Sequence, residues 1–296
     1  MLESCSRRDL FKLVTLAIPA TATMGLPIQP SNGFGFHDQM EGAGGGQSAS
    51  AANAGQTVPD AFPRQPSELV REMVLVSHYD LKRVQELVEV RPALARAAWD
   101  WGFGDWEDAL GAASHMGNRA IAEYLISKGA RPTLFSAAML GQLDVVKGMI
   151  SAQPGAQRIQ GPHSISLLAH AKAGGDAARP VFDFLQSLGD AGADSEPPLS
   201  QDDVDTVKGT YVFGPGMSQV DVTVERIIDP NDMKQMISRV TWTRQGMIGR
   251  PLNHLGNRTF YPWGAPSVRI QFTEENGARL MTVSDGDTTL VARRTQ

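Results

Sequence analysis

Apolar residues recur at helical spacing in three stretches of the first two thirds of the chain. These stretches are residues 79–88, 117–126 and 141–150, and each places apolar side chains at positions i, i+3 and i+4. The second and third stretches begin with a glycine, Gly117 and Gly141, which suits the tight turn between two paired helices. The pattern therefore predicts amphipathic helices, each preceded by a second helix with small side chains.

The order of these features resembles the ankyrin repeat. The family's inner Ala-Ala pair, turn glycine, outer apolar pairs and trailing Gly-Ala are matched by Ala137-Ala138, Gly141, Val145-Val146, Met149-Ile150 and Gly129-Ala130. The Thr-Pro-Leu-His opening is absent, and the units begin 38 and then 24 residues apart, counted from Tyr79 to Gly117 to Gly141, against about 33 in the family. With a degenerate fourth unit at 166–193, the resemblance implies an ankyrin-type repeat domain over residues 67–196 with an extended binding face.

Beyond residue 196 the apolar positions alternate, which is typical of half-buried strands. The alternating segments are 209–213, 220–228, 239–243, 268–272, 278–283 and 289–293. Asn-Gly and Asp-Gly pairs mark hairpin turns, and residues 253–260 look like turns as well. We therefore expect an α + β fold: an ankyrin-type helical repeat stack followed by a small antiparallel β domain at 197–296. That domain could be a meander, a small barrel or a strongly curved sheet.

The run from Phe260 to Phe272, followed by Asn276-Gly277 and a hairpin to the end, resembles the small β domain appended to some exported serine hydrolases and peptidases, over roughly residues 205–295. In those proteins the domain is an accessory and not the catalytic part. The resemblance implies that the β domain functions beside other proteins in the periplasm. It does not indicate an activity for this domain.

The first 22 residues resemble a bacterial twin-arginine signal. Arg7 and Arg8 precede a short apolar run that ends in small residues near Ala22, where we expect cleavage. The resemblance implies export to the periplasm, with membrane contact only during transit; an ordinary basic signal or a frayed terminus is the alternative. Residues 23–66, rich in Gly, Ser and Ala, are expected to be a flexible linker.

Net charge and cysteine content narrow the possible partners. The chain carries a net charge of −5 without a long basic block, so nucleic-acid binding is not expected. Its single cysteine, Cys5, lies in the expected signal, which leaves the mature chain without a cysteine metal site or disulfide.

An aromatic cluster lies between the first two helical units, and we regard it as the candidate binding site. It consists of Trp99, Trp101, Phe103 and Trp106. Exposed Trp and Phe side chains are strong binding anchors, but a buried aromatic plug is the alternative. A metal site at the neighbouring acids Asp100, Asp105, Glu107 and Asp108 is a weaker alternative, because acids beside glycine more often cap helices.

The sequence shows none of the common catalytic, zinc or nucleotide-binding motifs, so neither catalytic residues nor a cofactor or metal is expected. The leading hypothesis is a non-catalytic module that binds a cell-envelope or periplasmic protein or peptide. The second is an enzyme or enzyme subunit with a site between the domains, using His163, His170, Asp202 and Arg269. The third is a carrier that holds a small ligand inside the β domain.

Overall fold

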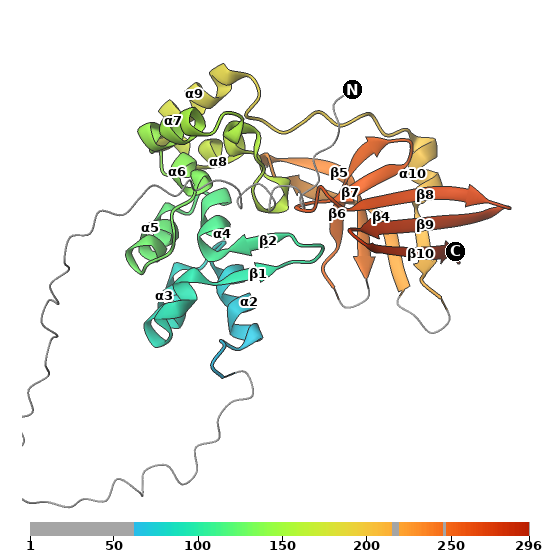
Figure 1. Ribbon diagram of the computed structural model, residues 1–296, viewed down its shortest axis with the longest axis horizontal. Helices are drawn as coiled ribbons and strands as arrows, with labels where there is room; N and C mark the ends of the chain where they lie inside the picture. The colour runs from blue at the N-terminus through green and yellow to red at the C-terminus, as the bar shows by residue number, and fades with distance from the viewer. Residues whose placement is uncertain (1–61, 215–218, 245–246, 296) are drawn as a thin grey trace, which may run out of the picture. The chain divides into compact units, whose positions relative to one another are not determined.

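The computed structural model describes residues 62–214, 219–244 and 247–295, all of which belong to one compact unit (Figure 1). The predicted signal at 1–22 and residues 23–61 of the predicted linker lie outside the described residues. None of the described helices is both long enough and apolar enough to cross a membrane.

The first part of the unit consists of consecutive helix pairs. Their bounds are α2 (Ser67–Val76), α3 (Leu81–Val90), α4 (Ala109–His115), α5 (Arg119–Ser127), α6 (Leu134–Met139), α7 (Leu143–Ala152), α8 (Leu167–Ala173) and α9 (Arg179–Leu188). Helices α3, α5 and α7 confirm the three amphipathic helices predicted from periodicity. Short 3₁₀ helices lie between them: η1 (Pro92–Arg96), η2 (Ala156–Arg158), η3 (Pro162–Ser164) and η4 (Gly175–Ala178).

The leading helices of the pairs pack side by side, α2 against α4, α4 against α6 and α6 against α8. Close approach is possible because their facing residues are small: Ala112, Ala113, Ala137 and Ala138 are all buried. Gly141 has φ 76°, and a Cβ there would lie 2.2 Å from the carbonyl oxygen of Ala177, so both the turn and the packing require glycine.

A short β-hairpin separates α3 and η1 from α4. Its strands, β1 (Ala98–Asp100) and β2 (Trp106–Asp108), pair in antiparallel register around a tip where Gly102 and Gly104 have positive φ. Asp108 then caps α4 by accepting a hydrogen bond from the backbone N–H of Gly111.

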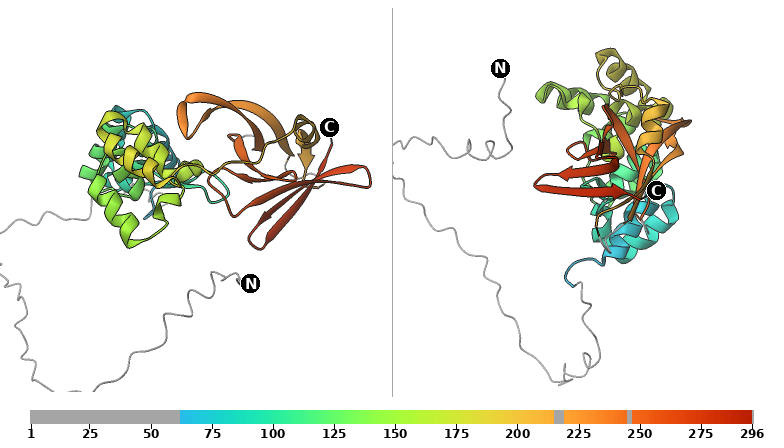
Figure 2. Two further views of the ribbon diagram at one scale, coloured as in Figure 1. Left: turned by 90° about the horizontal axis from the view of Figure 1, so that it is seen from above. Right: turned by 90° about the vertical axis from the view of Figure 1, so that its right-hand side faces the viewer.

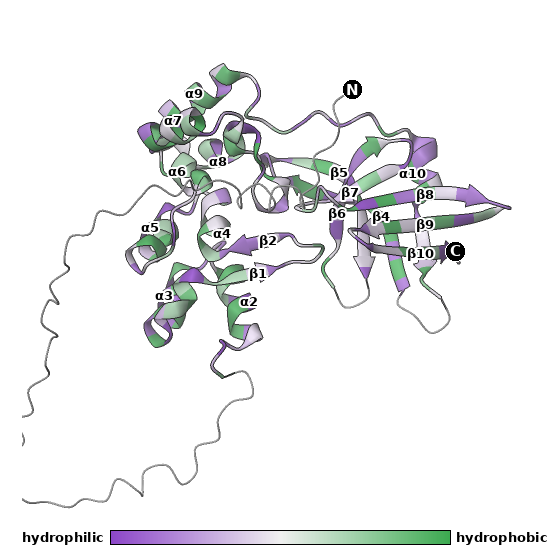
Figure 3. Cartoon of the chain, viewed as in Figure 1, coloured by the Kyte–Doolittle hydropathy of each residue, from purple (hydrophilic) through white to green (hydrophobic). Residues whose placement is uncertain are grey.

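The C-terminal part is a closed antiparallel barrel, introduced by helix α10 (Gln201–Val207). Its strands, in the order β10-β3-β4-β5-β6-β7-β8-β9 around the barrel, are β3 (Gly209–Val212), β4 (Gln219–Asp229), β5 (Asp232–Arg244), β6 (Arg250–Gly256), β7 (Thr259–Pro262), β8 (Arg269–Glu275), β9 (Ala278–Asp285) and β10 (Thr288–Arg294). Polar and apolar residues alternate along several of these strands (Figure 3). Strand β10 pairs with both β9 and β3, so the sheet has no free edge.

The barrel interior is filled by side chains. Tyr211, Leu252, Phe260, Ile270 and Met281 are fully buried and belong to one apolar cluster. The hypothesis of a small ligand held inside the β domain stays a prediction.

The expected fold class, an ankyrin-type helical repeat stack followed by a small antiparallel β domain, is wrong. The chain combines helices with a closed eight-stranded barrel, and such an arrangement is not an ankyrin stack. Residues 253–260 were expected to form turns because of their Asn and Gly residues, but they lie largely in β6 and β7, which allow the sheet to close. The division of the chain at residues 196 and 197 stays a prediction.

The long β4–β5 hairpin reaches back to the helices (Figure 2). At its turn, the Asn231 side chain accepts a hydrogen bond from the backbone N–H of Ser166, and Asp232 pairs with Lys172 of α8 at 2.8 Å. The barrel thus has its own points of attachment to the helical region.

Candidate metal centre

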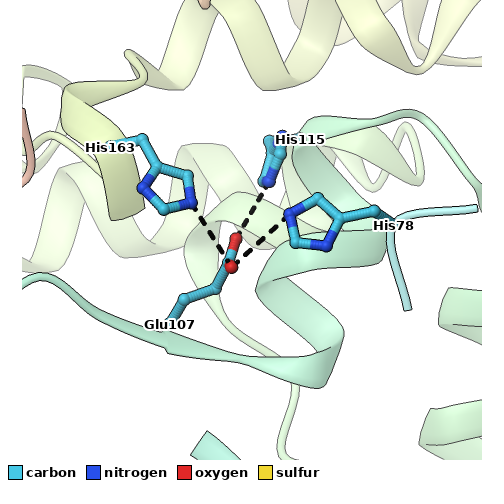
Figure 4. Close-up of side chains that lie close together, drawn as sticks. All are labelled: His78, Glu107, His115 and His163. Atoms are coloured by element: carbon cyan, nitrogen blue, oxygen red, sulfur yellow. Dashed lines mark hydrogen bonds and ion pairs between the residues drawn. The ribbon is translucent and has the colours of Figure 1, made fainter. Parts of the chain in front are cut away.

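Three histidines and one glutamate converge in the helical region. One nitrogen each of His78, His115 and His163 and one carboxylate oxygen of Glu107 all lie within 4.8 Å of one another. Figure 4 shows the three imidazole rings directed at the Glu107 carboxylate. Imidazole nitrogens and a carboxylate oxygen are a common ligand set for divalent transition metals.

Each of these side chains comes from a different element. His78 lies in the turn after α2, and Glu107 lies on β2 of the short hairpin. His115 is the last residue of α4, and His163 lies in η3 with a positive φ of 58°. A positive φ is uncommon for a residue with a side chain, and here it accompanies a ring directed at Glu107.

The separations fit the coordination sphere of a small ion. From Glu107 oxygens, Nε2 of His115 lies at 2.9 Å, that of His163 at 3.4 Å and that of His78 at 3.5 Å. A tetrahedral site with metal–ligand bonds of about 2.0 Å separates neighbouring ligand atoms by about 3.3 Å. The glutamate–histidine separations are therefore close to this value, and all four ligand atoms lie within 4.8 Å of one another.

Hydrogen bonds on the far side of two rings fix which nitrogen faces the centre. Nδ1 of His78 donates to the carbonyl oxygens of Val74 and Leu75 at 3.1 and 3.0 Å. Nδ1 of His163 lies 2.6 Å from Asp105. Because these oxygens accept, each Nδ1 carries a proton, so Nε2 is the nitrogen that faces Glu107 and that would bind a metal once it carries no proton of its own.

Glu107 is fully buried and is surrounded by donors. Besides the histidines, the indole N–H of Trp101 donates to its Oε2 at 2.8 Å. Burial opposes ionisation of Glu107, but the hydrogen bonds from His115 and His163 outweigh it and hold the pKa of this carboxyl well below its usual range. The glutamate is thus a carboxylate, the form that binds a metal.

The centre buries two carboxylates, and each needs positive partners. Asp105 and Glu107 are both buried, and Arg250 is the guanidinium paired with Asp105, at 2.9 Å. Burial alone would lower the pKa of His163, yet hydrogen bonds with Asp105 and Glu107 raise it to about 9. A proton on His163 therefore supplies positive charge that a divalent cation could supply instead.

His115 and His170 lie next to each other on the buried side of the centre, with ring centroids 6.4 Å apart. Burial lowers the pKa of both rings, that of His170 to about 4, so His170 is neutral near pH 7. Nδ1 of His170 donates to the carbonyl oxygen of Ser166, so this histidine stabilises the start of α8. His170 is not part of the metal-ligand group.

The predicted aromatic binding site is divided among three locations. Trp99 and Trp101 are half-buried against the helical core, and Phe103 packs edge-on to Trp242 of the barrel at 5.2 Å. Trp106 remains 63% exposed. The four side chains thus differ in exposure, and binding of a partner through Trp99, Trp101, Phe103 and Trp106 stays a prediction.

The residues suggested for an enzymatic site do not converge. His163 belongs to the metal-ligand group, whereas Asp202 is exposed at the start of α10. Arg269 is exposed and lines a separate cavity of about 790 Å³, whose lining does not include the four candidate ligands. That cavity carries polar side chains, among them Glu196, Arg239 and His254.

In the sequence, Glu107 and His163 are separate candidates, one among acids near a turn and one in a possible enzymatic site, and nothing there indicates that they lie together. The available signal was the alternation of Asp105 and Glu107 after the two glycines of a tight turn, which places both acids on one face of a strand. Read as a helix start, the same residues suggested only a cap.

Comparison with known proteins identifies no relative: no protein family matches the chain, and neither curated proteins nor solved structures include a significant match.

Proposed function

We propose that this protein is a metalloprotein that binds one divalent transition-metal ion, with zinc the best fit, through His78, Glu107, His115 and His163. The observation that carries the proposal is the convergence of these four ligand atoms within 4.8 Å. Surface acids often gather without a metal, but here the carboxylate is fully buried and three rings are directed at it. Burying such groups without a cation is costly unless they are paired.

The ligand set favours a structural role for zinc. Four protein ligands complete a tetrahedral site, whereas catalytic zinc sites usually keep one position for water. The ligands come from α4, β2, η3 and the turn after α2, so an ion would join four segments that span residues 78–163. Structural zinc supplies folding free energy directly, about 10–16 kcal/mol in small zinc domains.

The test is a zinc titration of the purified chain, stripped of metal by chelation, in competition with a chromogenic chelator. The expected result is one tight site per chain, which is lost in the His115→Gln variant. A matched control is His254→Gln, because His254 lies on β6 of the barrel and outside the ligand group.

Two results would contradict the proposal. One is the absence of a tight site in the unaltered chain. The other is equal zinc binding by the unaltered chain and by His115→Gln, which would place the ion elsewhere. Circular dichroism of each variant, recorded without metal, checks that the fold is retained.

Export through the twin-arginine route, a periplasmic location and a protein or peptide partner remain predictions. They are compatible with a structural metal, and a partner would have to be sought on surfaces other than the centre itself.

A further inference from the structure

The β-barrel contacts the candidate metal centre through a second layer of residues. Arg250, the first residue of β6, donates from Nη1 to Asp105 at 2.9 Å and from Nη2 to the carbonyl oxygen of Gly102 at 3.0 Å. Asp105 in turn accepts from Nδ1 of His163 at 2.6 Å and from the backbone N–H of the same residue at 2.9 Å. A continuous chain of hydrogen bonds thus runs from the barrel to a metal ligand.

A second barrel segment reaches the same place. The backbone N–H of Gly264 donates to Oγ of Ser164, the residue after His163, at 2.9 Å. A Cβ on Gly264 would lie 1.9 Å from Oδ1 of Asp105, so the barrel backbone lies directly against this carboxylate. The contact requires glycine both for space and for its φ of 75°.

We propose that Arg250 is a positioning residue of the metal centre: by holding Asp105 against His163, the barrel sets the orientation of a ligand that the helical region supplies. This inference rests on the proposed function. It extends that function because metal binding and attachment of the barrel then become linked, and each must strengthen the other by the same factor.

The chemistry supports a direct effect on affinity. A carboxylate that accepts from a ligating imidazole fixes the orientation of the ring and raises its basicity, and removal of such partners typically costs about 10–100-fold in metal affinity. Arg250 is only 11% exposed, so its guanidinium holds Asp105 with little screening by solvent.

The experiment compares zinc affinity in two variants that each lose one ion pair between barrel and helices. Arg250→Met removes the contact to Asp105, and Lys172→Met removes the contact to Asp232, which lies on the β4–β5 hairpin. Arg250→Met is expected to raise the zinc Kd about tenfold or more. Lys172→Met should leave it unchanged, and Arg250→Lys, which keeps the charge, should recover part of the affinity.

A second measurement tests the reverse effect, that of zinc binding on the attachment of the barrel. Hydrogen exchange of backbone amides in β6 and β7 is expected to slow when zinc is added to the unaltered chain and to Lys172→Met, but much less in Arg250→Met. If Arg250→Met fails to fold, Asp105→Asn offers a milder change in the same chain of hydrogen bonds and should also weaken zinc binding.

Three outcomes separate the two claims. Absence of zinc binding by the unaltered chain would contradict the proposed function itself. Tight zinc binding that is the same in Arg250→Met would overturn only the positioning role. An equal loss of affinity in Arg250→Met and Lys172→Met would also overturn it, because general attachment of the barrel would then explain the effect.

Discussion

The interior of the barrel and the centre of the helical region differ in the kind of side chain that they hide from water. The barrel buries an apolar set that includes Tyr211, Phe260 and Met281. The helical region also has apolar cores, but between them it buries Glu107, Asp105 and His115. The barrel also buries Asn253 and His254, but apolar packing dominates its interior, whereas the buried carboxylates of the centre need a cation or protons to balance their charge.

This difference shows where a function should be sought. The packed apolar side chains of the barrel contribute mainly to stability. Buried ionisable residues cost stability unless they are paired, and they cluster where they bind or react. The comparison therefore predicts that substitutions in the barrel interior change stability alone, while substitutions at the centre change metal affinity.

The largest effect is expected for Glu107→Gln, which preserves shape but removes the only carboxylate among the four ligands. Zinc affinity should fall by more than about 100-fold, since loss of an outer partner alone costs about 10–100-fold. The measurement is a chelator-competition titration. Glu123→Gln is the matched control, because Glu123 is an exposed partner of Arg119 on α5. Retention of tight binding by Glu107→Gln would contradict the assignment of this ligand.

The next prediction concerns the barrel. Met281→Ala removes a fully buried side chain of the apolar cluster and should lower the free energy of unfolding by about 2–5 kcal/mol. Urea denaturation measures this loss, and zinc titration of the folded variant should give the affinity of the unaltered chain. A lower zinc affinity in well-folded Met281→Ala would show that the two regions are not distinct in the way described.

A smaller difference in zinc affinity is expected between substitutions of Trp101 and of Trp106, two residues that the sequence predicts in one binding site. Trp101→Phe keeps an aromatic ring but deletes the N–H that donates to Glu107, so zinc affinity should fall about tenfold. Trp106→Phe changes a largely exposed ring and should leave both affinity and stability within about 0.5 kcal/mol of the original values. Equal behaviour of the two variants in zinc titrations would refute the different roles.

The smallest expected effect is a gradual change of fold stability and zinc affinity with pH. In the metal-free chain the pKa of His163 is raised from 6.5 to about 9, so its proton stabilises the fold below pH 6.5 and that contribution is lost as the pH rises towards 9. Zinc must displace this proton, so zinc affinity should increase by up to about tenfold per pH unit over the same interval. Zinc titrations at several pH values measure the slope, and a flat profile would contradict the role of His163.

Local patterns in the sequence predicted local structure well. Helices α3, α5 and α7 follow from their apolar spacing, and the positive φ of Gly117 and Gly141 follows from their place before each helix. A small barrel was one of three alternatives for the β domain, but local patterns could not select it, because β6 carries Asn253 and Gly256, which favour turns in isolation. Pairing with neighbouring strands outweighs these local preferences.

The candidate centre was harder to predict because its residues are far apart in the chain. His78 and His163 are separated by 85 positions, and no two of the ligands have the spacing of a known zinc motif. Their convergence depends on α2 packing against α4 and on the hairpin that carries Glu107. Only the three-dimensional arrangement of these segments reveals the shared site.

The central claim is that one ion binds to three imidazoles and one carboxylate in the helical region. X-ray absorption spectroscopy of the chain loaded with one equivalent of zinc tests it most directly. The account predicts about four N or O neighbours at about 2.0 Å, with the scattering pattern of three imidazole rings, and one fewer ring in His78→Gln. A spectrum dominated by water oxygens, or one that is identical in that variant, would contradict it.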